Sequence, residues 1–535
     1  MVQDQELAKA VAAIPQRSER QPDLPKLVGA FVDVGILAQV QNTNNQIMYG
    51  RRGTGKTHIF RVLESILASS APNIVVYIDA RTLGSTSQFS DPTVPLPTRC
   101  TALFRDILGE IHTVLLEHIV DLGGPEAEAS LVELDGLAQV VTEPFTTQIP
   151  EKSATRISER TSEGATAEAS LAVGSPAHSK LALGSSTHRD TEAERLVNYA
   201  VVTQDKIVFP AISSHLRVIL ERLASQLNVL IYEWSSLPTD VQPYLAEFFK
   251  RAFIALPRVT LKIAALEHRS TFRIQKPSGA VGFEMGADIS AGLDIDDYYV
   301  FDRNPERITD AFGDMLVRHL RNELPMGYLE STLGIHRGQE LASKPFSERA
   351  VFQELVRASE GVARDLINIF STSYFAVHRK GKEKIERAAV LEGARLWFEQ
   401  DKEGNLDDTL REVLRRITDE VIGERQARSF LLPRQLGDHP IIQRLFDLRV
   451  LHLVQRGYAD KDKPGVRYNI YCLDYGTYVD LLNTSKRPDL GFTIRDNGDD
   501  QLDFVVPFDD KRSIRRIILT QEILEHGSNS PAPAQ

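Results

Sequence analysis

A glycine-rich octapeptide holds the residues of this sequence whose types and spacing are best suited to binding phosphate. Its fixed positions match the pattern G-x-x-x-x-G-K-[ST]. In such a loop the backbone N–H groups point inward, the next helix adds positive potential at its N-terminus, and Lys56 reaches the outer phosphates. A side chain at the glycine positions would block the phosphates or forbid the backbone angles. The pattern predicts a nucleoside-triphosphate site, with Thr57 as a Mg²⁺ ligand, formed by Gly50, Arg51, Arg52, Gly53, Thr54, Gly55, Lys56, Thr57 and His58.

A second, acidic site is expected at the end of a neighbouring strand. In P-loop ATPases an aspartate there holds Mg²⁺ through water, and the glutamate after it polarises the attacking water. In this chain Tyr232 stands at the aspartate position and Glu233 follows it. Two interpretations stay open. Either Glu233 is the catalytic base beside a magnesium held by Thr57, the phosphates and water, or Glu233 takes the metal-side role and hydrolysis is slow.

The elements that must position these residues alternate between strands and helices. An apolar run before the octapeptide predicts a short buried strand, and apolar residues at helical spacing after it predict a helix. Such alternation implies an α/β fold whose mostly parallel sheet is covered on both faces, with the glycine loop at the carboxyl end of a strand. Strands are predicted at 46–49, 73–79, 228–232 and 260–266, and helices at 57–67, 98–120, 211–225 and 242–255.

The composition is that of an ordinary soluble globular chain, and its 535 residues suggest about three domains. No apolar run approaches the roughly twenty residues that span a bilayer, so no membrane contact is expected. The N-terminus lacks a secretion signal, which predicts a cytoplasmic location. Two cysteines cannot build a disulfide framework or a cysteine-rich zinc site. The net charge of −11 argues against indiscriminate binding to nucleic acid.

With these motifs the chain resembles an AAA+ ATPase, closest to the origin-recognition-complex-like, replication-initiator type and, within it, a poorly characterised bacterial branch. The resemblance covers most of residues 30–485. It implies a small helical lid after the core, bound ATP and Mg²⁺, and association with other copies. The absence of an Asn-Lys-x-Asp guanine signature also favours ATP over GTP. The motifs that carry the resemblance are Gly50 to Thr57, Glu233-Trp234-Ser235-Ser236-Leu237-Pro238 and Lys262-Ile263-Ala264-Ala265.

The same resemblance implies sensor residues. A polar "sensor 1" residue belongs at the end of the strand beside the acidic strand, where this chain has Glu267 or His268, and Arg269 is a candidate arginine finger toward a neighbouring subunit. The alternative is that this triplet is a solvated strand end. A "sensor 2" arginine in a G-x-x-R turn corresponds to Arg364, which would meet the γ-phosphate. Alternatively, Arg364 pairs only with Asp365 or a nearby glutamate.

The C-terminal region has the outline of a winged helix, which the replication-initiator type also carries after its lid. An amphipathic helix at 407–422 and a second at 439–451 precede a hairpin with a basic tip. DNA and a partner protein both stay open as its ligand. If the ligand is DNA, Arg444 and Arg449 lie on the recognition helix, and the wing residues that meet backbone phosphates are Lys461, Lys463 and Arg467.

Composition shifts complete the expected organisation. Residues 1–30 are polar and interrupted by prolines, which predicts a loosely held arm. Residues 123–195 bury too little apolar area to offset their ordering entropy, which predicts a mobile insertion with short helices at its edges. The expected parts are the arm at 1–30, the nucleotide-binding core with this insertion at 31–299, the helical lid at 300–400, the winged-helix-like domain at 401–487 and a tail at 488–535.

Two functions of different classes follow from these features. The first is an ATPase that changes shape with its nucleotide, assembles with copies of itself and acts on DNA. The second is a weakly hydrolysing, nucleotide-gated scaffold or sensor that recruits a protein effector, as in bacterial anti-phage defence. Tyr232 favours the second function, whereas Glu233 and Arg364 favour the first. Nuclease and protease activities have no support, since no nucleophile or metal motif accompanies the loop.

Overall fold

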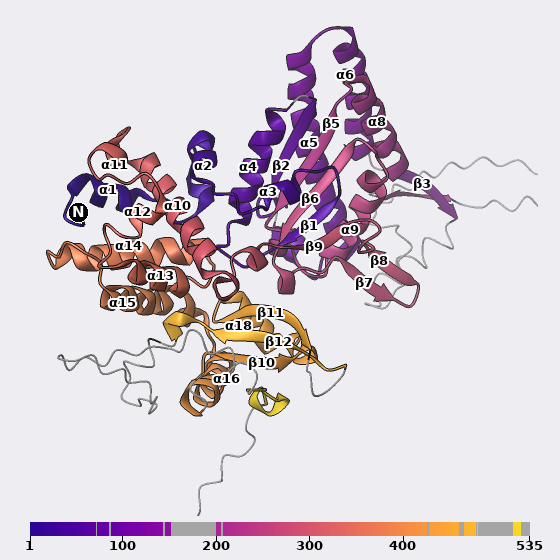
Figure 1. Cartoon of the computed structure of the whole chain (residues 1–535). Coiled ribbons are helices and arrows are strands. Elements are labelled where there is room, and N and C mark those ends of the chain that lie inside the picture. The colour runs from indigo at the N-terminus through magenta and orange to yellow at the C-terminus, as the bar shows by residue number, and fades with distance from the viewer. Residues whose placement is uncertain are drawn as a thin grey trace, which may run out of the picture.

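The fold consists of a sheet-based core, a helical lid and a C-terminal domain (Figure 1). The computed structural model describes residues 1–70, 72–84, 87–142, 207–424, 427–459, 465–477, 479 and 517–525, together with the strands at 145–150 and 199–204. The predicted wing residues Lys461 and Lys463 lie outside the described residues, as do residues 151–195 of the predicted insertion and most of the predicted tail.

The core is a sheet of five parallel strands in the order β2-β5-β6-β1-β9. The strand β1, which leads into the glycine loop, pairs with β6 on one side and with β9 on the other. The register is continuous through β2, β5 and β6, so their carboxyl ends lie at one edge. This arrangement confirms the predicted fold class. The strands are β1 Gln46–Tyr49, β2 Asn73–Asp79, β5 Gln226–Tyr232, β6 Val259–Ala265 and β9 Ser290–Asp294.

Helices cover both faces of the sheet. One face packs against α5, α8 and α9 through a large apolar cluster, and the other packs against α4. The central strands β5 and β6 are almost wholly buried because both faces are covered, as their continuous apolar runs predict. The core helices are α3 Leu37–Val40, α4 Lys56–Ala68, α5 Leu96–Leu122, α6 Pro125–Thr142, α8 Phe209–Arg222 and α9 Gln242–Phe249.

A helix forms at the N-terminal edge of the predicted insertion, as expected, and it is longer than the short helix predicted there. The helix α6 covers 125–142 and packs between α5 and α8, with Leu134 and Leu137 each 1% exposed. His215 of α8 contacts Glu133 of α6 at 2.9 Å and ties the two helices together. The buried apolar residues of α6 lie on one face of the helix and pack against the neighbouring helices, although the segment as a whole is rich in polar residues. Two further antiparallel strand pairs belong to this part of the chain: β3 Phe145–Pro150 with β4 Tyr199–Gln204, and the hairpin of β7 Arg273–Lys276 with β8 Gly279–Gly282.

The lid lies beside the sheet and contains the chain's N-terminus (Figure 1). The prediction of a loosely held arm over 1–30 is wrong, because α1 and α2 bury apolar side chains on the rest of the protein. Leu7, Val11 and Ile14 belong to the same apolar cluster as the lid helices, while α2 packs against α4 and α10. These helices are α1 Gln5–Ala13, α2 Leu24–Ala30, α10 Pro305–Glu323, α11 Tyr328–Ser331, α12 Gly338–Leu341, α13 Arg349–Ala358, α14 Ala363–Arg379 and α15 Arg387–Trp397.

The C-terminal domain combines helices with a three-stranded antiparallel sheet in the order β10-β12-β11. The elements follow one another as helix, strand, two helices and a two-stranded hairpin. It lies against both the core and the lid (Figure 1). Its elements are α16 Asp408–Thr418, β10 Ser429–Pro433, α17 Arg434–Gly437, α18 Pro440–Asp447, β11 Leu451–Ala459 and β12 Arg467–Leu473.

Candidate functional site

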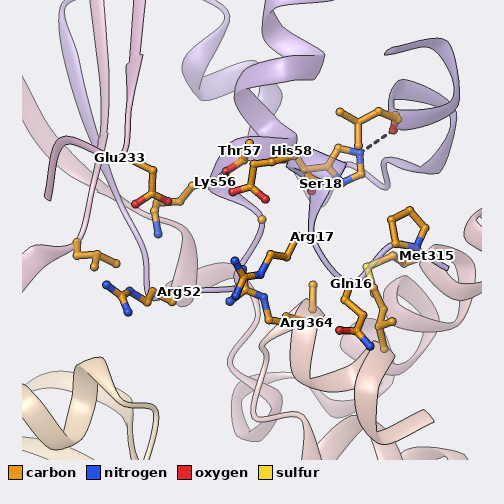
Figure 2. A pocket seen from close by; sticks show the side chains of 18 of the residues that line it. Gln16, Arg17, Ser18, Arg52, Lys56, Thr57, His58, Glu233, Met315 and Arg364 are labelled. Carbon is orange, nitrogen blue, oxygen red and sulfur yellow. Dashed lines mark hydrogen bonds between the residues drawn. The ribbon is translucent and has the colours of Figure 1, made fainter. Parts of the chain in front are cut away.

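A cavity of about 350 Å³ opens where the glycine loop, the lid and the N-terminal segment meet (Figure 2). Most of the predicted phosphate-binding residues line it. The exceptions are Gly50, Arg51 and Thr54, which belong to the loop but do not line the cavity. The predicted residues that line it are Arg52, Gly53, Gly55, Lys56, Thr57, His58, Glu233 and Arg364.

The glycine loop is shaped by its own backbone and by Lys56. Gly55 has φ 101°, a left-handed angle that favours glycine, and the chain passes from it directly into α4. The ammonium of Lys56 donates to the carbonyls of Gly50 and Arg51 at 2.7 and 2.9 Å. Burial lowers the pKa of Lys56 to about 8, although nearby carboxylates, Glu233 first among them, oppose this effect. A bound anion would raise the pKa of this lysine again.

Arg51 does not face the cavity, contrary to its predicted role in binding phosphate. Its backbone N–H and its Nε both donate to one carboxylate oxygen of Asp296, each at 3.0 Å. The same guanidinium donates to His452 Nδ1 of the C-terminal domain and lies over the ring of Phe446. Arg51 is 5% exposed. Arg51 therefore connects the glycine loop to the C-terminal domain and does not contact the cavity.

The lid delivers Arg364 to the loop. Its backbone N–H donates to the carbonyl of Gly53 at 3.1 Å, and a Cβ at Gly53 would approach the Cβ of Arg364 to 2.8 Å. The alternative pairing of Arg364 with Asp365 does not form, because Asp365 pairs with Arg449 and Lys402. Arg364 Nε has no hydrogen-bond partner among the described residues. A buried guanidinium without a carboxylate is suited to an anionic ligand.

Arg17 of the N-terminal segment faces Arg364 across the cavity (Figure 2). Burial, followed by the positive charges of Arg449 and Arg17, lowers the pKa of Arg364. Among the described residues, Arg17 forms no ion pair. Sequence reasoning missed Arg17 because it placed the N-terminal segment in a loose arm, and only the apolar spacing of α1 signals that the segment is anchored. Two facing cations favour a polyanion between them.

Glu233 lines the cavity beside Lys56 (Figure 2). Tyr232 does not line it, and its hydroxyl donates to Asp79 at the end of β2. Glu233 has φ 55°, and its carbonyl accepts from the backbone N–H and hydroxyl of Ser236 at 2.9 and 2.7 Å. This tight turn places the carboxylate at the end of β5. The oxygen donors Thr57 and Glu233 fit Mg²⁺, which is usually held by a few carboxylates together with substrate phosphates and water.

The triplet proposed as sensor and arginine finger contacts the C-terminal domain. Glu267 accepts from both terminal nitrogens of Arg456, at 3.1 and 2.6 Å. The ring of His268 meets Phe446 edge to face, and Arg269 Nε donates to Asp447 at 2.9 Å. Of residues 266–269, Leu266 lines the cavity. All three side chains have partners within the chain, so the triplet is not simply a solvated strand end, and its roles as sensor and arginine finger remain predictions.

The predicted DNA-reading helix is only partly exposed. Phe446 and Asp447 at the end of α18 lie against the core, as described above. Arg449 is not on this helix, contrary to prediction: it lies in the following turn with φ 60°, is 5% exposed and pairs with Asp365 and Asp401. Arg444 remains 54% exposed and pairs with Asp407 at 2.8 Å. Arg467 is exposed at the start of β12.

Two further features describe the chain. Among the described residues, no helix combines the length and the apolar character that a bilayer crossing requires. No group of three histidine, cysteine or carboxylate residues is arranged to hold a metal ion in the described part of the chain. The sheet, the glycine loop and the lid that contributes Arg364 together form the α/β arrangement that the sequence motifs predicted.

Comparisons with known proteins find no matching family model and no matching curated protein. Among solved structures, Cdc6p from Pyrobaculum aerophilum has a TM-score of 0.31 and 13% identity over 89% of this chain and 96% of its own. The ORC2 protein of Aeropyrum pernix has a TM-score of 0.31 and 11% identity over 84% of this chain and 91% of its own. Drosophila ORC bound to DNA has a TM-score of 0.28 and 11% identity over 89% and 92%. These proteins are of the type that the sequence motifs resemble, but likenesses of this size carry no argument about ligands or activity.

Proposed function

We propose that this chain is an ATP-binding AAA+ ATPase whose lid and C-terminal domain change position with the bound nucleotide. The observation that carries the proposal is the meeting of Lys56, Arg364 and Arg17 at one cavity. Each cation comes from a different part of the chain: the glycine loop, the lid and the N-terminal segment. A triphosphate among them would neutralise their mutual repulsion and hold the three parts together.

The apolar end of the cavity suits a base. His58, Leu27 and Met315 line it, and the Nε2 of His58 contacts the carbonyl of Leu27 at 2.7 Å. A smaller neighbouring cavity of about 30 Å³, lined by Phe31 and Phe312, shares His58 and Met315. We propose that the adenine lies between His58 and Met315. The triphosphate would then run along the glycine loop toward Lys56, where the cations gather.

Mg²⁺ bound with the nucleotide would supply positive charge to the β- and γ-phosphates. Thr57 and Glu233 are the residues proposed to hold it. Glu233 also lies where a carboxylate can accept a proton from an attacking water. Lys56 and Arg364 would stabilise the negative charge that develops on the transferred phosphoryl group. Because Tyr232 stands at the aspartate position, we expect the chain to bind ATP but to hydrolyse it slowly.

Self-association and DNA contact are the finer parts of the proposal. Arg444 and Arg467 are exposed on the C-terminal domain, and with Lys461 and Lys463 they are proposed to meet backbone phosphates. Arg269 is proposed to act on a neighbouring subunit only after its pair with Asp447 opens. Sedimentation with and without ATP measures whether the chain assembles.

Steady-state ATP turnover with and without duplex DNA tests the proposal. The expected result is Mg²⁺-dependent turnover that DNA increases and that Arg364→Ala reduces by about tenfold or more. Arg303→Ala is the matched control, since Arg303 pairs with Asp297 and lies outside the cavity. Turnover that is equal in the wild type and Arg364→Ala would contradict the proposed role of the lid.

One observation favours a second candidate function: the neutral phenol of Tyr232 stands where an aspartate would hold the metal. This candidate is a nucleotide-gated scaffold or sensor that hydrolyses ATP poorly and recruits a protein effector. ATP-dependent assembly without turnover, together with no binding to duplex DNA, would favour this candidate over the first. The same turnover and sedimentation measurements therefore separate the two.

A further inference from the structure

The side chain of Tyr232 is fully engaged away from the nucleotide cavity. Its hydroxyl donates to Asp79 and accepts from Arg81 at 3.0 Å, and its ring packs on Tyr77 with ring centroids 4.8 Å apart. Burial, followed by the hydrogen bond to Asp79, raises the pKa of Tyr232 to about 12, so the phenol stays neutral. Position 232 therefore supplies no carboxylate to a metal at the cavity.

The nearest strand-end carboxylate cannot replace it. Asp79 at the end of β2 accepts from Arg81 Nε at 3.0 Å and from Arg81 NH2 at 2.7 Å, in addition to the hydroxyl of Tyr232. It also accepts the backbone N–H of Arg81 at 2.9 Å. These donors occupy both oxygens of Asp79. Any second carboxylate for the metal must therefore come from another part of the chain.

Glu19 of the N-terminal segment is such a carboxylate. Its Oε1 lies 3.4 Å from the hydroxyl oxygen of Thr57, the residue proposed to bind the metal, and 4.0 Å from Arg81 NH1. The side chain of Glu19 is 23% exposed and lines the cavity. Two oxygens at adjacent corners of a Mg²⁺ octahedron, each about 2.1 Å from the metal, lie about 3 Å apart. The separation of Glu19 and Thr57 is close to this value.

The position of Glu19 is fixed by anchors on both sides. Before it, α1 is buried in the lid: Val11 is 1% exposed, and Asp4 caps this helix and accepts from the hydroxyl of Tyr328 at 2.9 Å. After it, α2 packs on α4, and the carbonyl of Lys26 accepts from Asn322 at 2.7 Å. A segment held at both ends can present one side chain at a defined place.

We propose that Glu19 supplies the second carboxylate of the Mg²⁺–nucleotide site, directly or through a water, in place of the aspartate that Tyr232 replaces. The inference rests on the proposed ATP binding and deepens it. Because Glu19 lies between α1, which packs in the lid, and α2, which packs on α4 of the core as well as on α10 of the lid, the metal would bind only when lid and core are closed around the nucleotide. The N-terminal segment thereby becomes part of the site.

Mn²⁺ is the probe that tests this assignment without measuring turnover. Electron paramagnetic resonance gives the affinity of Mn²⁺ for the full chain saturated with a non-hydrolysable ATP analogue. We expect Glu19→Gln to weaken Mn²⁺ binding by about tenfold, since one charged oxygen ligand is lost. Without a divalent cation, the variant should bind the analogue at least as tightly as the wild type, because a negative charge beside the phosphates is gone.

Glu6→Gln is the matched control, because Glu6 lies on α1, pairs only with Lys9 among the described residues and carries the same charge. It should leave Mn²⁺ affinity unchanged. Adding Tyr232→Asp to Glu19→Gln should recover part of the lost affinity, because it returns a carboxylate to the strand end.

An unchanged Mn²⁺ affinity in Glu19→Gln, with or without a lower thermal midpoint, would overturn the assignment and leave Glu19 as a structural partner of Arg81. In that case ATP binding by the wild type would still support the proposed function. If the wild type binds no analogue at all, the proposed function fails and takes this inference with it.

Discussion

At the scale of single residues, the nucleotide cavity is notable for cations that lack carboxylate partners. Arg364 and Arg17 face each other, and the ammonium of Lys56 donates to backbone carbonyls rather than to an acid. By contrast, Arg51 of the glycine loop pairs with Asp296, and Arg449 of the C-terminal domain pairs with Asp365. The like charges of Lys56, Arg364 and the exposed Arg17 repel one another, so their gathering at one cavity favours an anionic ligand.

Tyr232→Asp tests the role of the missing aspartate. We expect it to raise Mg²⁺-dependent ATP hydrolysis several-fold, because the new carboxylate can hold a metal-bound water at the end of β5. Tyr232→Phe is the control, since it removes the hydrogen bond to Asp79 without adding charge. A rate in Tyr232→Asp that is no higher than in the wild type would show that position 232 does not face the metal site.

Arg364→Lys tests whether the planar guanidinium matters beyond its charge. A lysine keeps the positive charge but cannot make two parallel hydrogen bonds to a phosphate group. We expect ATP affinity to fall about tenfold in Arg364→Lys and further in Arg364→Ala, as measured by calorimetry. Equal affinities in the wild type and both variants would place the γ-phosphate away from the lid.

At the scale of elements, the N-terminal helices connect the lid to the core. The helix α1 buries Leu7, Ala10 and Val11 among the lid helices, and α2 lies between α4 and α10. The cavity residues Arg17 and Glu19 lie on the short stretch between these two helices. A change that loosens α1 should therefore weaken nucleotide binding as well as lid stability.

Leu7→Ala tests this connection. Leu7 is 2% exposed, and removing its buried side chain is expected to cost about 2–5 kcal/mol of unfolding free energy. We also expect weaker Mg²⁺-ATP binding, because Glu19 and Arg17 would be held less firmly. Lys9→Ala on the exposed face of the same helix is the control. Thermal unfolding and calorimetry of both variants give the two readouts, and a loss of stability with full affinity would count against the connection.

A buried histidine predicts how stability depends on pH. His452 on β11 faces Arg51, Asp474 and, through Asp474, Lys402. Burial, followed by the charge of Arg51, lowers the pKa of His452 from 6.5 to about 3. Between these pH values the unfolded chain binds more protons than the folded chain, so the unfolding free energy falls as pH falls. At pH 5 the loss from this residue is about 2 kcal/mol relative to pH 7.

The comparison of His452→Gln with the wild type isolates this contribution. The variant cannot take up the proton, so its stability should fall less between pH 7 and pH 5. Urea unfolding at the two pH values measures the difference, and other buried histidines such as His319 contribute equally to both proteins. Parallel losses in the two proteins would mean that His452 already titrates normally in the folded state.

At the scale of the whole molecule, the sequence predicted the core well and the contacts between parts poorly. Strand β2 was predicted to the residue, and β5 and β6 within two residues, because continuous apolar runs mark buried parallel strands. By contrast, nothing local in the sequence reveals that Arg51 turns toward His452 or that Arg449 pairs with Asp365. Such contacts depend on how distant elements pack, and periodicity carries no information about that packing.

The same limit explains the errors in the N-terminal region. Polar residues and prolines outweigh the apolar positions of α1, yet Leu7, Ala10, Val11 and Ile14 share one helical face. Sequence reasoning therefore found Lys56, Glu233 and Arg364 at the cavity but missed Arg17 and Glu19. The residues that line this cavity come from parts that are distant in the sequence, which a motif alone does not show.

DNA contact belongs to this largest scale, because α18 lies partly against the core. If the C-terminal domain binds duplex DNA, its affinity should fall steeply as the salt concentration rises. The double variant Arg467→Ala with Lys461→Ala should reduce the slope of log affinity against log salt concentration by the equivalent of about two phosphate contacts. Fluorescence anisotropy over a salt series, with and without ATP, measures both quantities. Binding that is insensitive to salt, or binding only to a protein partner, would favour the scaffold function instead.

Calorimetric titration of the purified, folded full chain with Mg²⁺-ATP tests the central claim most directly, because every proposed role depends on a triphosphate bound beside Lys56. The account predicts saturable binding at a single site and at least about tenfold weaker binding in Lys56→Ala, where the cation that reaches the outer phosphates is lost. If the wild-type chain shows no affinity for adenine nucleotides, or if Lys56→Ala binds them equally well, the account is contradicted.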